Sequence, residues 1–380
     1  MNRGHKTAIL AFCLAPALVS AAAAGEGTVG AEFLRIVQSP RVVGMGESGA
    51  GGYGDLLGAL ALNPAALART GYREAAFTYN SWLEGVATQE AAYAQPLRSG
   101  VAAVSVMELS MPSIDAYDNN GVPDGQVNAG DLAAGFSYAA RLYGPWQDSR
   151  YGLFAGGTLK YAREKLAGVN AAAPLMDLGG LWIGKAPGGT LALGVSAQSL
   201  GGGFKFDSTS DPAPSVFRAG ASYIVLAAGD PVTFSADIKK NDNSPAALCA
   251  GAEYQVWRTI SVRAGYISGE DLGGGLRFGG GVTLKLLQFD YSLSSYGKYG
   301  PAHRFSLSYK FDKPVSVTPH LTRKQEEAEE KTAEGRALMA DGRYYDAVVE
   351  LNSALMLDPE NSEAMDLMRK ARDLIGAPGQ

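Results

Sequence analysis

Apolar and polar residues alternate along most of the chain, and the clearest example runs from Phe305 to Phe311. Side chains of a β-strand point to opposite faces in turn, so every second residue of this stretch shares a face. One face carries Phe305, Leu307, Tyr309 and Phe311, and the other carries Ser306, Ser308 and Lys310. The stretch therefore predicts an amphipathic strand that ends on an aromatic residue.

Many segments upstream follow the same two-residue period between glycine, proline, asparagine and aspartate boundaries, which predicts about fourteen strands. They are expected at 73–80, 88–96, 100–109, 130–143, 150–166, 173–184, 189–200, 214–226, 231–240, 245–257, 258–268, 274–286, 287–296 and 301–311. In two of them the faces are clear: Leu287, Phe289, Tyr291 and Leu293 oppose Gln288, Asp290, Ser292 and Ser294, and Thr158, Lys160, Ala162 and Glu164 oppose Leu159 and Tyr161.

The connections between these strands are expected to alternate in length. Residues 110–129, 167–172 and 201–213 would form longer connections, and residues 145–149 and 185–188 shorter ones. Outer-membrane barrels have short periplasmic turns and longer outer loops, and an even number of strands places both barrel ends in the periplasm.

No apolar run after the N-terminus reaches the ~18–20 residues that a membrane helix needs. A closed barrel satisfies every backbone polar group in lipid. The pattern therefore predicts an all-β transmembrane barrel in the outer membrane, with Phe305–Phe311 as its closing strand. A soluble β-sandwich is the alternative.

Composition agrees with an exported membrane barrel. Glycine supplies 49 of 380 residues and charged residues only 19 %, against about 7 % and about 25 % in ordinary soluble proteins. A positive N-terminus, the apolar run Ala8–Val19 and the small residues Ala22–Ala24 predict a signal peptide over residues 1–24. Its removal leaves Cys249 as the only cysteine, so no intrachain disulfide can form. The acidic balance, with no basic patch, argues against nucleic-acid binding.

The chain divides into five predicted regions. They are a signal peptide at 1–24, an N-terminal segment at 25–72, a barrel at 73–312, a linker at 313–320 and a helical domain at 321–380. Two prolines between Lys313 and Pro319 favour an extended linker. Charged residues become much more frequent after it, which marks a domain boundary.

A glycine motif stands in the N-terminal segment. Gly44-Met45-Gly46-Glu47-Ser48-Gly49 matches the spacing of dinucleotide-binding loops. Such a loop needs a strand before it, a helix after it and an acidic residue about twenty positions later. Here the glycine-rich Ala50–Gly54 follows, and Asn63-Pro64 occupies the acidic position. The motif therefore does not predict a nucleotide site.

The same segment resembles the opening signature of the PorV/PorQ family, which belongs to the FadL-like outer-membrane superfamily. The resemblance spans roughly Phe33 to Phe311 and rests on Arg41–Gly49, Leu62–Leu67, Tyr79–Leu83, Asp177–Gly179, Arg263–Tyr266 and Asp290–Tyr291. It implies a fourteen-stranded barrel whose N-terminal segment folds into the lumen as a hatch. The signature residues of this hatch would be Gly44, Gly46, Asn63, Pro64 and Ala65. The alternative is an N-terminal extension that only caps the barrel.

The last region predicts helices at about 323–341, 344–357 and 362–375. The spacing of Gly335, Leu338, Gly342, Tyr344, Ala347, Leu351, Ala354 and Pro359 resembles a tetratricopeptide repeat. One repeat with a capping helix is fewer than the ~3 repeats that usually stand alone, so the domain is expected to lean on the barrel, dimerise or take a partner. We expect a periplasmic docking module, with a passive stabilising tail as the alternative.

Residues that serve catalysis are scarce. After the signal peptide only His303 and His320 remain, and no paired-cysteine or H-E-x-x-H motif exists, so neither a transition metal nor a cofactor is expected. His303 lies near Ser306 and Ser308, but no G-x-S-x-G turn or orienting acid accompanies them. We therefore expect no enzyme.

The longest loop holds a weak calcium candidate made of Asp118, Asn120 and Asp124. The twelfth position from Asp118 is Ala129 rather than glutamate, which excludes an EF-hand. A solvated turn held by the Asp118 side chain is the alternative.

Two functions remain open from the sequence. The PorV/PorQ resemblance implies a non-enzymatic component of protein export or surface attachment, as in type IX secretion, with outer loops that bind exported proteins. The wider superfamily implies passive uptake of hydrophobic small molecules, which needs an apolar pocket between hatch and wall. The expected partners are outer-membrane lipid, exported or periplasmic proteins and, for uptake, a hydrophobic small molecule. Candidate polar residues of the lumen are Lys160, Glu164, Asp177 and Asp290, which would either fill it or line a path.

Overall fold

The computed structural model describes residues 29–311 and 323–376, apart from residues 98, 119, 145–149, 167, 207–208, 243, 270–272 and 360. The predicted signal peptide and linker lie outside the described residues. Among the described residues, no helix combines the length and hydropathy needed to cross a membrane.

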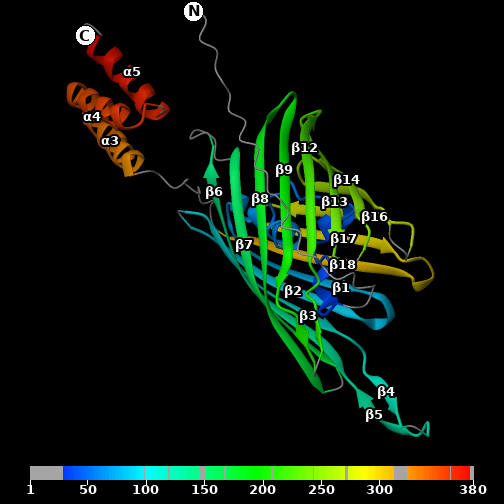
Figure 1. The fold of residues 1–380 in the computed structure, drawn as a ribbon. Helices are drawn as coiled ribbons and strands as arrows, with labels where there is room; N and C mark the ends of the chain where they lie inside the picture. The colour runs from blue at the N-terminus through cyan, green and yellow to red at the C-terminus, as the bar shows by residue number, and fades with distance from the viewer. Residues whose placement is uncertain are drawn as a thin grey trace, which may run out of the picture.

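Fourteen antiparallel strands form one closed barrel, in the order β1-β18-β17-β16-β15-β14-β13-β12-β9-β8-β7-β6-β3-β2 (Figure 1). They are β1 (Arg73–Ser81), β2 (Ala87–Pro96), β3 (Val101–Ser110), β6 (Ala129–Tyr143), β7 (Gly152–Leu166), β8 (Val169–Ala186), β9 (Gly189–Gly201), β12 (Val216–Ala227), β13 (Asp230–Asn241), β14 (Ala247–Val256), β15 (Ile260–Ile267), β16 (Leu276–Leu284), β17 (Leu287–Ser295) and β18 (Pro301–Phe311). Each predicted strand is present, with ends that differ by a few residues. One closed barrel replaces the two packed sheets of the sandwich alternative.

Strand β18 closes the barrel by pairing with β1 on one side and β17 on the other. Its four apolar residues from Phe305 to Phe311 point outward and are 36–47 % exposed, whereas the inward Ser306 and Ser308 are only 4 % and 6 % exposed. Exposed apolar and buried polar side chains are the reverse of a soluble protein, and they match a wall with lipid outside and polar packing inside.

The two ends of the barrel differ. The end where β1 begins and β18 stops, here called the short-turn end, carries tight connections at residues 187–188, 228–229 and 285–286. The opposite end, the loop end, carries most of the longer ones. Two of these contain hairpins that the sequence pattern missed, β4 (Ile114–Tyr117) with β5 (Pro123–Val127) and β10 (Phe204–Lys205) with β11 (Ser210–Asp211). The β4–β5 hairpin projects beyond the barrel (Figure 1).

One expected loop is wrong. The connection between β7 and β8 covers only residues 167–168, because β8 starts at Val169 and pairs there with Leu166. The alanines at positions 171 and 173 continue the inward face, at 2 % and 1 % exposure. Alanine has low strand propensity, so the sequence pattern does not predict that the strand extends through these alanines. At the short-turn end, the connection between β6 and β7 is longer than expected, at residues 144–151.

The N-terminal segment, residues 29–72, lies inside the barrel. It contains η1 (Glu32–Arg35), α1 (Pro40–Gly44), α2 (Leu56–Leu62) and η2 (Pro64–Arg69), and nearly all of it is buried. Helix α1 packs against β15 to β18, α2 against β1 and β2, and η2 against β3 and β6 to β8. Side-chain hydrogen bonds link the segment to β9, β12, β13 and β14 as well. Contact with every strand of a closed barrel requires a position within the lumen.

Polar caps explain why this segment has short helices rather than one long helix. The Ser39 hydroxyl accepts a hydrogen bond from the Val42 N–H at the start of α1, and the Asp55 carboxylate accepts one from Gly58 N–H at the start of α2. Asn63 ends α2 and caps η2. Each capping side chain satisfies a backbone donor that the helix itself leaves free.

The described C-terminal residues form three helices, α3 (Arg323–Ala340), α4 (Tyr344–Leu357) and α5 (Ser362–Gly376). Their core contains Ala347, Leu351, Ala354 and Ala364, all fully buried. A Cβ atom at Gly335 would lie 2.6 Å from Leu351 Cγ, so the glycine permits α3 and α4 to approach closely. Gly342 supplies the positive φ of the turn between them, and Leu338 packs against the core. Two other short helices, η3 (Leu83–Gly85) and η4 (Gly297–Tyr299), lie in barrel loops.

Candidate functional site

Glycines bring the backbone of the N-terminal segment against the barrel wall. Gly46 has φ +66°, and a Cβ there would lie 2.4 Å from the Tyr266 backbone nitrogen. The facing strands are also glycine at these points: a Cβ at Gly265 would lie 2.0 Å from Gly46 N, and one at Gly251 2.3 Å from Met45 O. Gly44 lies against Gly279 in the same way. The high glycine content therefore has a structural cause, since any side chain at these positions would separate the segment from the wall.

Asn63 joins two parts of the segment to the wall. Its amide nitrogen donates to the carbonyl of Ala50 at 2.8 Å and to that of Gly180 in β8 at 3.1 Å, while its side-chain oxygen accepts from Ala65 N–H. Pro64 takes the first position of η2 and, with Ala65, lies against Gly156 and Gly179. The five signature residues therefore all lie at the contact between the segment and the wall.

A chain of buried charges crosses from the segment to three strands. The Arg41 guanidinium in α1 donates to both carboxylate oxygens of Glu253 in β14, at 2.9 and 2.6 Å. Arg263 in β15 donates to the same carboxylate at 2.5 Å and to Asp290 in β17 at 2.6 Å. Arg41 also pairs with Asp55 at 3.0 Å. Each group has a partner of opposite charge, as burial in low dielectric demands.

A second polar cluster holds the turn after α1. Glu47 pairs with Lys239 at 2.8 Å and with Arg218 at 3.6 Å. One carboxylate oxygen of Asp237 accepts hydrogen bonds from the backbone nitrogens of Gly49 and Ala50, both at 2.8 Å. Anions that accept from successive backbone N–H groups fix the path of the chain.

The predicted lumen residues all point inward, into different settings. Lys160 and Asp177 form an ion pair at 2.9 Å, and Asp290 belongs to the charge chain. Asp177 also accepts the backbone N–H of Ser199, which has φ +54° at a bulge between β8 and β9. One carboxylate oxygen of Glu164 is buried without a hydrogen bond.

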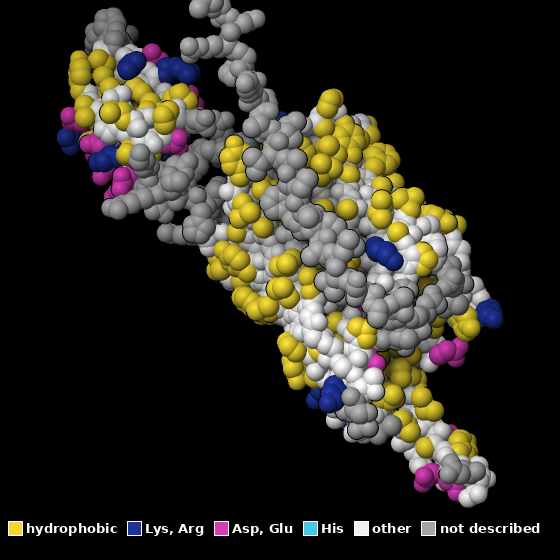
Figure 2. Space-filling model, in the orientation of Figure 1, with side chains coloured by type: hydrophobic (Ala, Val, Ile, Leu, Met, Phe, Trp, Pro, Cys, Tyr) yellow, Lys and Arg dark blue, Asp and Glu magenta, His cyan; other side chains and the backbone are white. Residues whose placement is uncertain are grey.

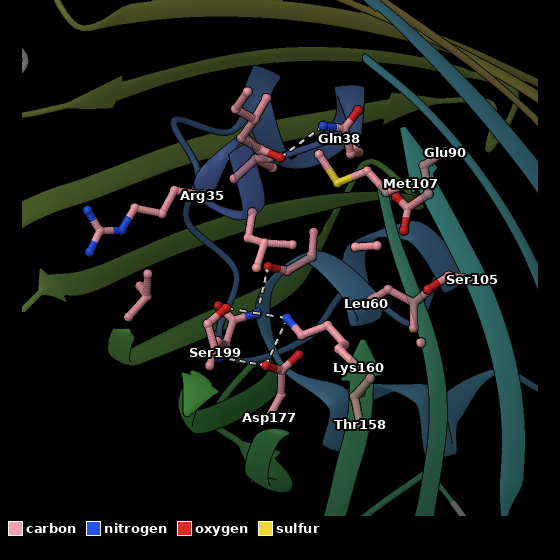
Figure 3. Close-up of a pocket in the computed structure, with 18 of the residues that line it drawn as sticks. Arg35, Gln38, Leu60, Glu90, Ser105, Met107, Thr158, Lys160, Asp177 and Ser199 are labelled. Carbon is pink, nitrogen blue, oxygen red and sulfur yellow. Dashed lines mark hydrogen bonds and ion pairs between the residues drawn. The ribbon is translucent and has the colours of Figure 1, made fainter. Parts of the chain in front are cut away.

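A cavity of about 80 Å³ lies between the segment and strands β2, β3, β6 to β9, β12 and β13 (Figure 3). Its lining is mixed. Charged and polar groups come from Arg35, Gln38, Glu90, Ser105, Thr158, Lys160, Asp177, Gln198, Ser199, Arg218 and Lys239, and apolar surface from Leu34, Ile36, Val37, Leu60, Ala61, Met107, Ala133, Ala134 and Val216. The space admits several water molecules but falls below the ~300–1,000 Å³ of typical small-molecule pockets.

Sequence analysis missed Arg41, Glu253, Arg263 and Glu90 as lumen groups. Glu253 and Arg263 stand at inward positions of β14 and β15, next to outward apolar residues. The alternation of these charged residues with apolar neighbours therefore predicts that both side chains point into the lumen. No pattern in the sequence marks Arg41 as a lumen residue, because its partner Glu253 lies 212 residues further along the chain.

His303 does not form a catalytic pair with Ser306 or Ser308. His303 accepts or donates a hydrogen bond with the Tyr291 hydroxyl at 2.8 Å, and both residues belong to the outward face of their strands. Ser306 and Ser308 belong to the inward face. The wall of the barrel therefore separates these residue types.

The calcium candidate is an exposed turn. The Asp118 carboxylate accepts the backbone N–H groups of Val122 and Asn120, both at 2.8 Å, and these bonds hold the pKa of Asp118 below its usual value. Asp124 lies in β5. No cluster of three or more metal-ligating His, Cys, Asp or Glu side chains occurs in the part of the chain that the structure describes.

The fold and the site together define a closed β-barrel whose lumen is filled by its own N-terminal segment. No family model and no curated protein matches the chain. Among solved structures, it is similar to the toluene transporter TodX of Pseudomonas putida, with 12 % identity over 70 % of this chain and 95 % of TodX and a TM-score of 0.46. A FadL homologue of Pseudomonas aeruginosa gives 12 % identity, 72 % and 98 % coverage and a TM-score of 0.43. The outer membrane protein Omp33 of Acinetobacter baumannii is 14 % identical over 63 % of this chain and 98 % of its own, with a TM-score of 0.37. At these values the likeness bears on neither substrate nor mechanism.

Proposed function

We propose that this protein is a non-enzymatic outer-membrane barrel of the PorV/PorQ type, closed by its N-terminal segment as a hatch and used in protein export or surface attachment. The observation that carries the proposal is the filled lumen. The hatch contacts all fourteen strands, and two clusters of buried ion pairs fix it. A barrel built this way serves better as a rigid platform in the membrane than as an open pore.

The outer surface supports a place in lipid. Apolar side chains occupy much of the barrel face that Figure 2 leaves uncovered, whereas charged ones gather mainly on the C-terminal helices and at loops. Exposed aromatic residues lie near both barrel ends: Tyr93, Tyr254 and Trp257 toward the short-turn end, and Tyr79, Tyr266 and Tyr299 toward the loop end. Aromatic girdles at two levels flank the apolar band of membrane barrels.

A charge on the apolar band should be costly only within lipid. Leu307 lies near the middle of β18, is 47 % exposed and pairs with the outward Phe77 and Phe289. In bilayers, Leu307→Arg should destabilise the folded barrel by about 2 kcal/mol, because the guanidinium would replace an apolar group in hydrocarbon.

The control is Ile114→Arg on the projecting hairpin, which is 56 % exposed outside the barrel and should cost almost nothing. Urea unfolding of the purified variants in lipid vesicles measures both. Equal costs at the two positions would argue against a membrane position for β18.

The orientation follows from the two ends. Short turns face the periplasm in outer-membrane barrels, and the chain leaves the barrel at the short-turn end after Phe311. The C-terminal helices would therefore be periplasmic. Their packing of small residues, with Gly335 against Leu351, suits a tetratricopeptide-like docking module. The loop end, with the β4–β5 hairpin, would face the exterior and offer exported proteins a contact.

Uptake of hydrophobic small molecules is the alternative function, and the cavity between hatch and wall is the feature that favours it. Its apolar side includes Leu34, Leu60 and Met107. Uptake would need this space to widen and to lose contact with its charged lining, since the closed form is both small and half polar.

Deletion of the gene separates the two functions. If the export proposal holds, the set of proteins at the cell surface should shrink, while uptake of hydrocarbons and fatty acids stays unchanged. Surface proteomics of the deletion strain, with a complemented strain as control, measures the first effect, and growth on hydrophobic substrates the second. An unaltered surface proteome together with impaired growth would replace the export proposal by uptake.

A further inference from the structure

Glu90 is a buried carboxylate on the wall of the cavity. It points inward from β2, is 8 % exposed and lies on the cavity wall beside Met107, its neighbour across the β2–β3 pair (Figure 3). Among the residues that the structure describes, no hydrogen bond or ion pair reaches its carboxylate. Lys160 is the charged group that acts on it through space. A buried carboxylate without a partner is costly, which indicates that something else neutralises it.

The other charges around the cavity balance one another. Lys160 pairs with Asp177 at 2.9 Å. Arg218 and Lys239 share Glu47, and Arg35 has both Glu32 and Asp242. Within the described part of the chain, these pairs leave Glu90 as the one carboxylate of the lining that has no ion pair. A single positive charge would complete the site.

The surroundings of Glu90 select among monovalent cations. Its neighbours on the lining include the hydroxyl of Ser105 and the apolar side chains of Met107, Ala133 and Leu34. An alkali ion needs a shell of several oxygen ligands, and the residue directly opposite Glu90, Met107, offers none. A primary ammonium group needs only a carboxylate and one or two further acceptors, and its alkyl part would cover the apolar surface.

We propose that this cavity binds a small primary alkylammonium ion, with its nitrogen on the Glu90 carboxylate and its alkyl chain against Met107 and Ala133. The volume of about 80 Å³ limits the ligand to a few non-hydrogen atoms. This site is independent of the export proposal, because it concerns an occupant of the closed lumen rather than a partner outside it.

The test uses the full-length protein in detergent micelles with n-butylammonium as the probe. Binding to the folded state alone should raise the melting temperature with probe concentration. Neutral n-butanol at the same concentration should have no such effect. Glu90→Gln keeps the shape but removes the charge, and it should weaken probe binding at least tenfold. Glu108→Gln, at an exposed outward position of β3, is the matched control and should bind as the wild type does.

Several outcomes would overturn the proposal. Equal stabilisation by sodium or potassium chloride would make this an inorganic-ion site. Equal binding by Glu90→Gln would remove the carboxylate from the site. Absence of any probe effect on the wild type at both pH 7 and pH 9 would show that the cavity does not bind the ammonium ion. If Glu90→Gln fails to fold, calorimetric titration of the wild type with n-butylammonium against n-butanol decides alone, and equal heats would refute the proposal.

Discussion

Replacing Gly179 by valine should release the N-terminal segment from the wall, at a cost of about 3 kcal/mol or more in docking free energy. A Cβ at this inward position of β8 would lie 2.1 Å from the Asn63 side-chain oxygen, 2.9 Å from Pro64 Cδ and 3.0 Å from the Ala65 nitrogen. Asn63 cannot move aside, because its three hydrogen bonds to Ala50, Gly180 and Ala65 fix it. Limited proteolysis of residues 29–72 and thermal unfolding in micelles measure the loss.

The neighbouring residue supplies the control. Gly180 points outward, and a Cβ there would meet only Val195 Cγ2 at an ordinary 3.5 Å. Gly180→Val should therefore leave the N-terminal segment protected from protease and stabilise the strand, since valine favours β-structure. Equal protease sensitivity of the two variants would show that the contact between Gly179 and the N-terminal segment does not explain the glycine at this position.

The strands and their faces could be predicted because the signal is local. In β17 and β18, lipid on one side and packed polar groups on the other impose opposite demands on adjacent residues, so the two-residue period is sharp. The start of β8 was not predicted as strand because its alanines fit both the lipid side and the lumen side, so no two-residue alternation is visible there. The β4–β5 hairpin escaped because both of its faces are exposed, and no alternation is then required.

The site was harder to predict than the fold. A residue's position in the alternating pattern of a strand shows whether its side chain points inward or outward, but not which residue it contacts. Asp290 could be assigned to the lumen from its strand alone. Its ion-pair partners could not be assigned in this way. Asp290 pairs with Arg263, Arg263 pairs with Glu253, and Glu253 pairs with Arg41, and this series of ion pairs depends on how the N-terminal segment lies across the barrel. The same holds for the glycines. The composition shows that glycine is in excess, but only the position of the N-terminal segment shows that Gly179 contacts it and that Gly180 does not.

Removing the Glu253 carboxylate should be the most damaging single change in the charge chain. Glu253→Gln would leave the Arg41 and Arg263 guanidinium groups, at 13 % and 1 % side-chain exposure, beside each other with one fewer negative charge. Breaking a buried ion pair on one side typically costs about 3–5 kcal/mol, because a charge stays buried without compensation. Asp55 and Asp290 still hold the outer ends of the chain, so we expect the lower part of that range. Urea unfolding of the purified barrel measures it.

A double-mutant cycle with Arg41→Met identifies which contact is lost. If the bidentate pair between the N-terminal segment and the wall carries the cost, the double variant should be less destabilised than the sum of the single variants by about 2 kcal/mol, because Arg41→Met removes the cation that Glu253→Gln alone leaves without this partner. Additive costs would show that Glu253 acts through Arg263 and the wall alone. The N-terminal segment would then be held by its backbone contacts and by the ion pairs of Glu47, and Arg41→Met alone should leave residues 29–72 protected from protease.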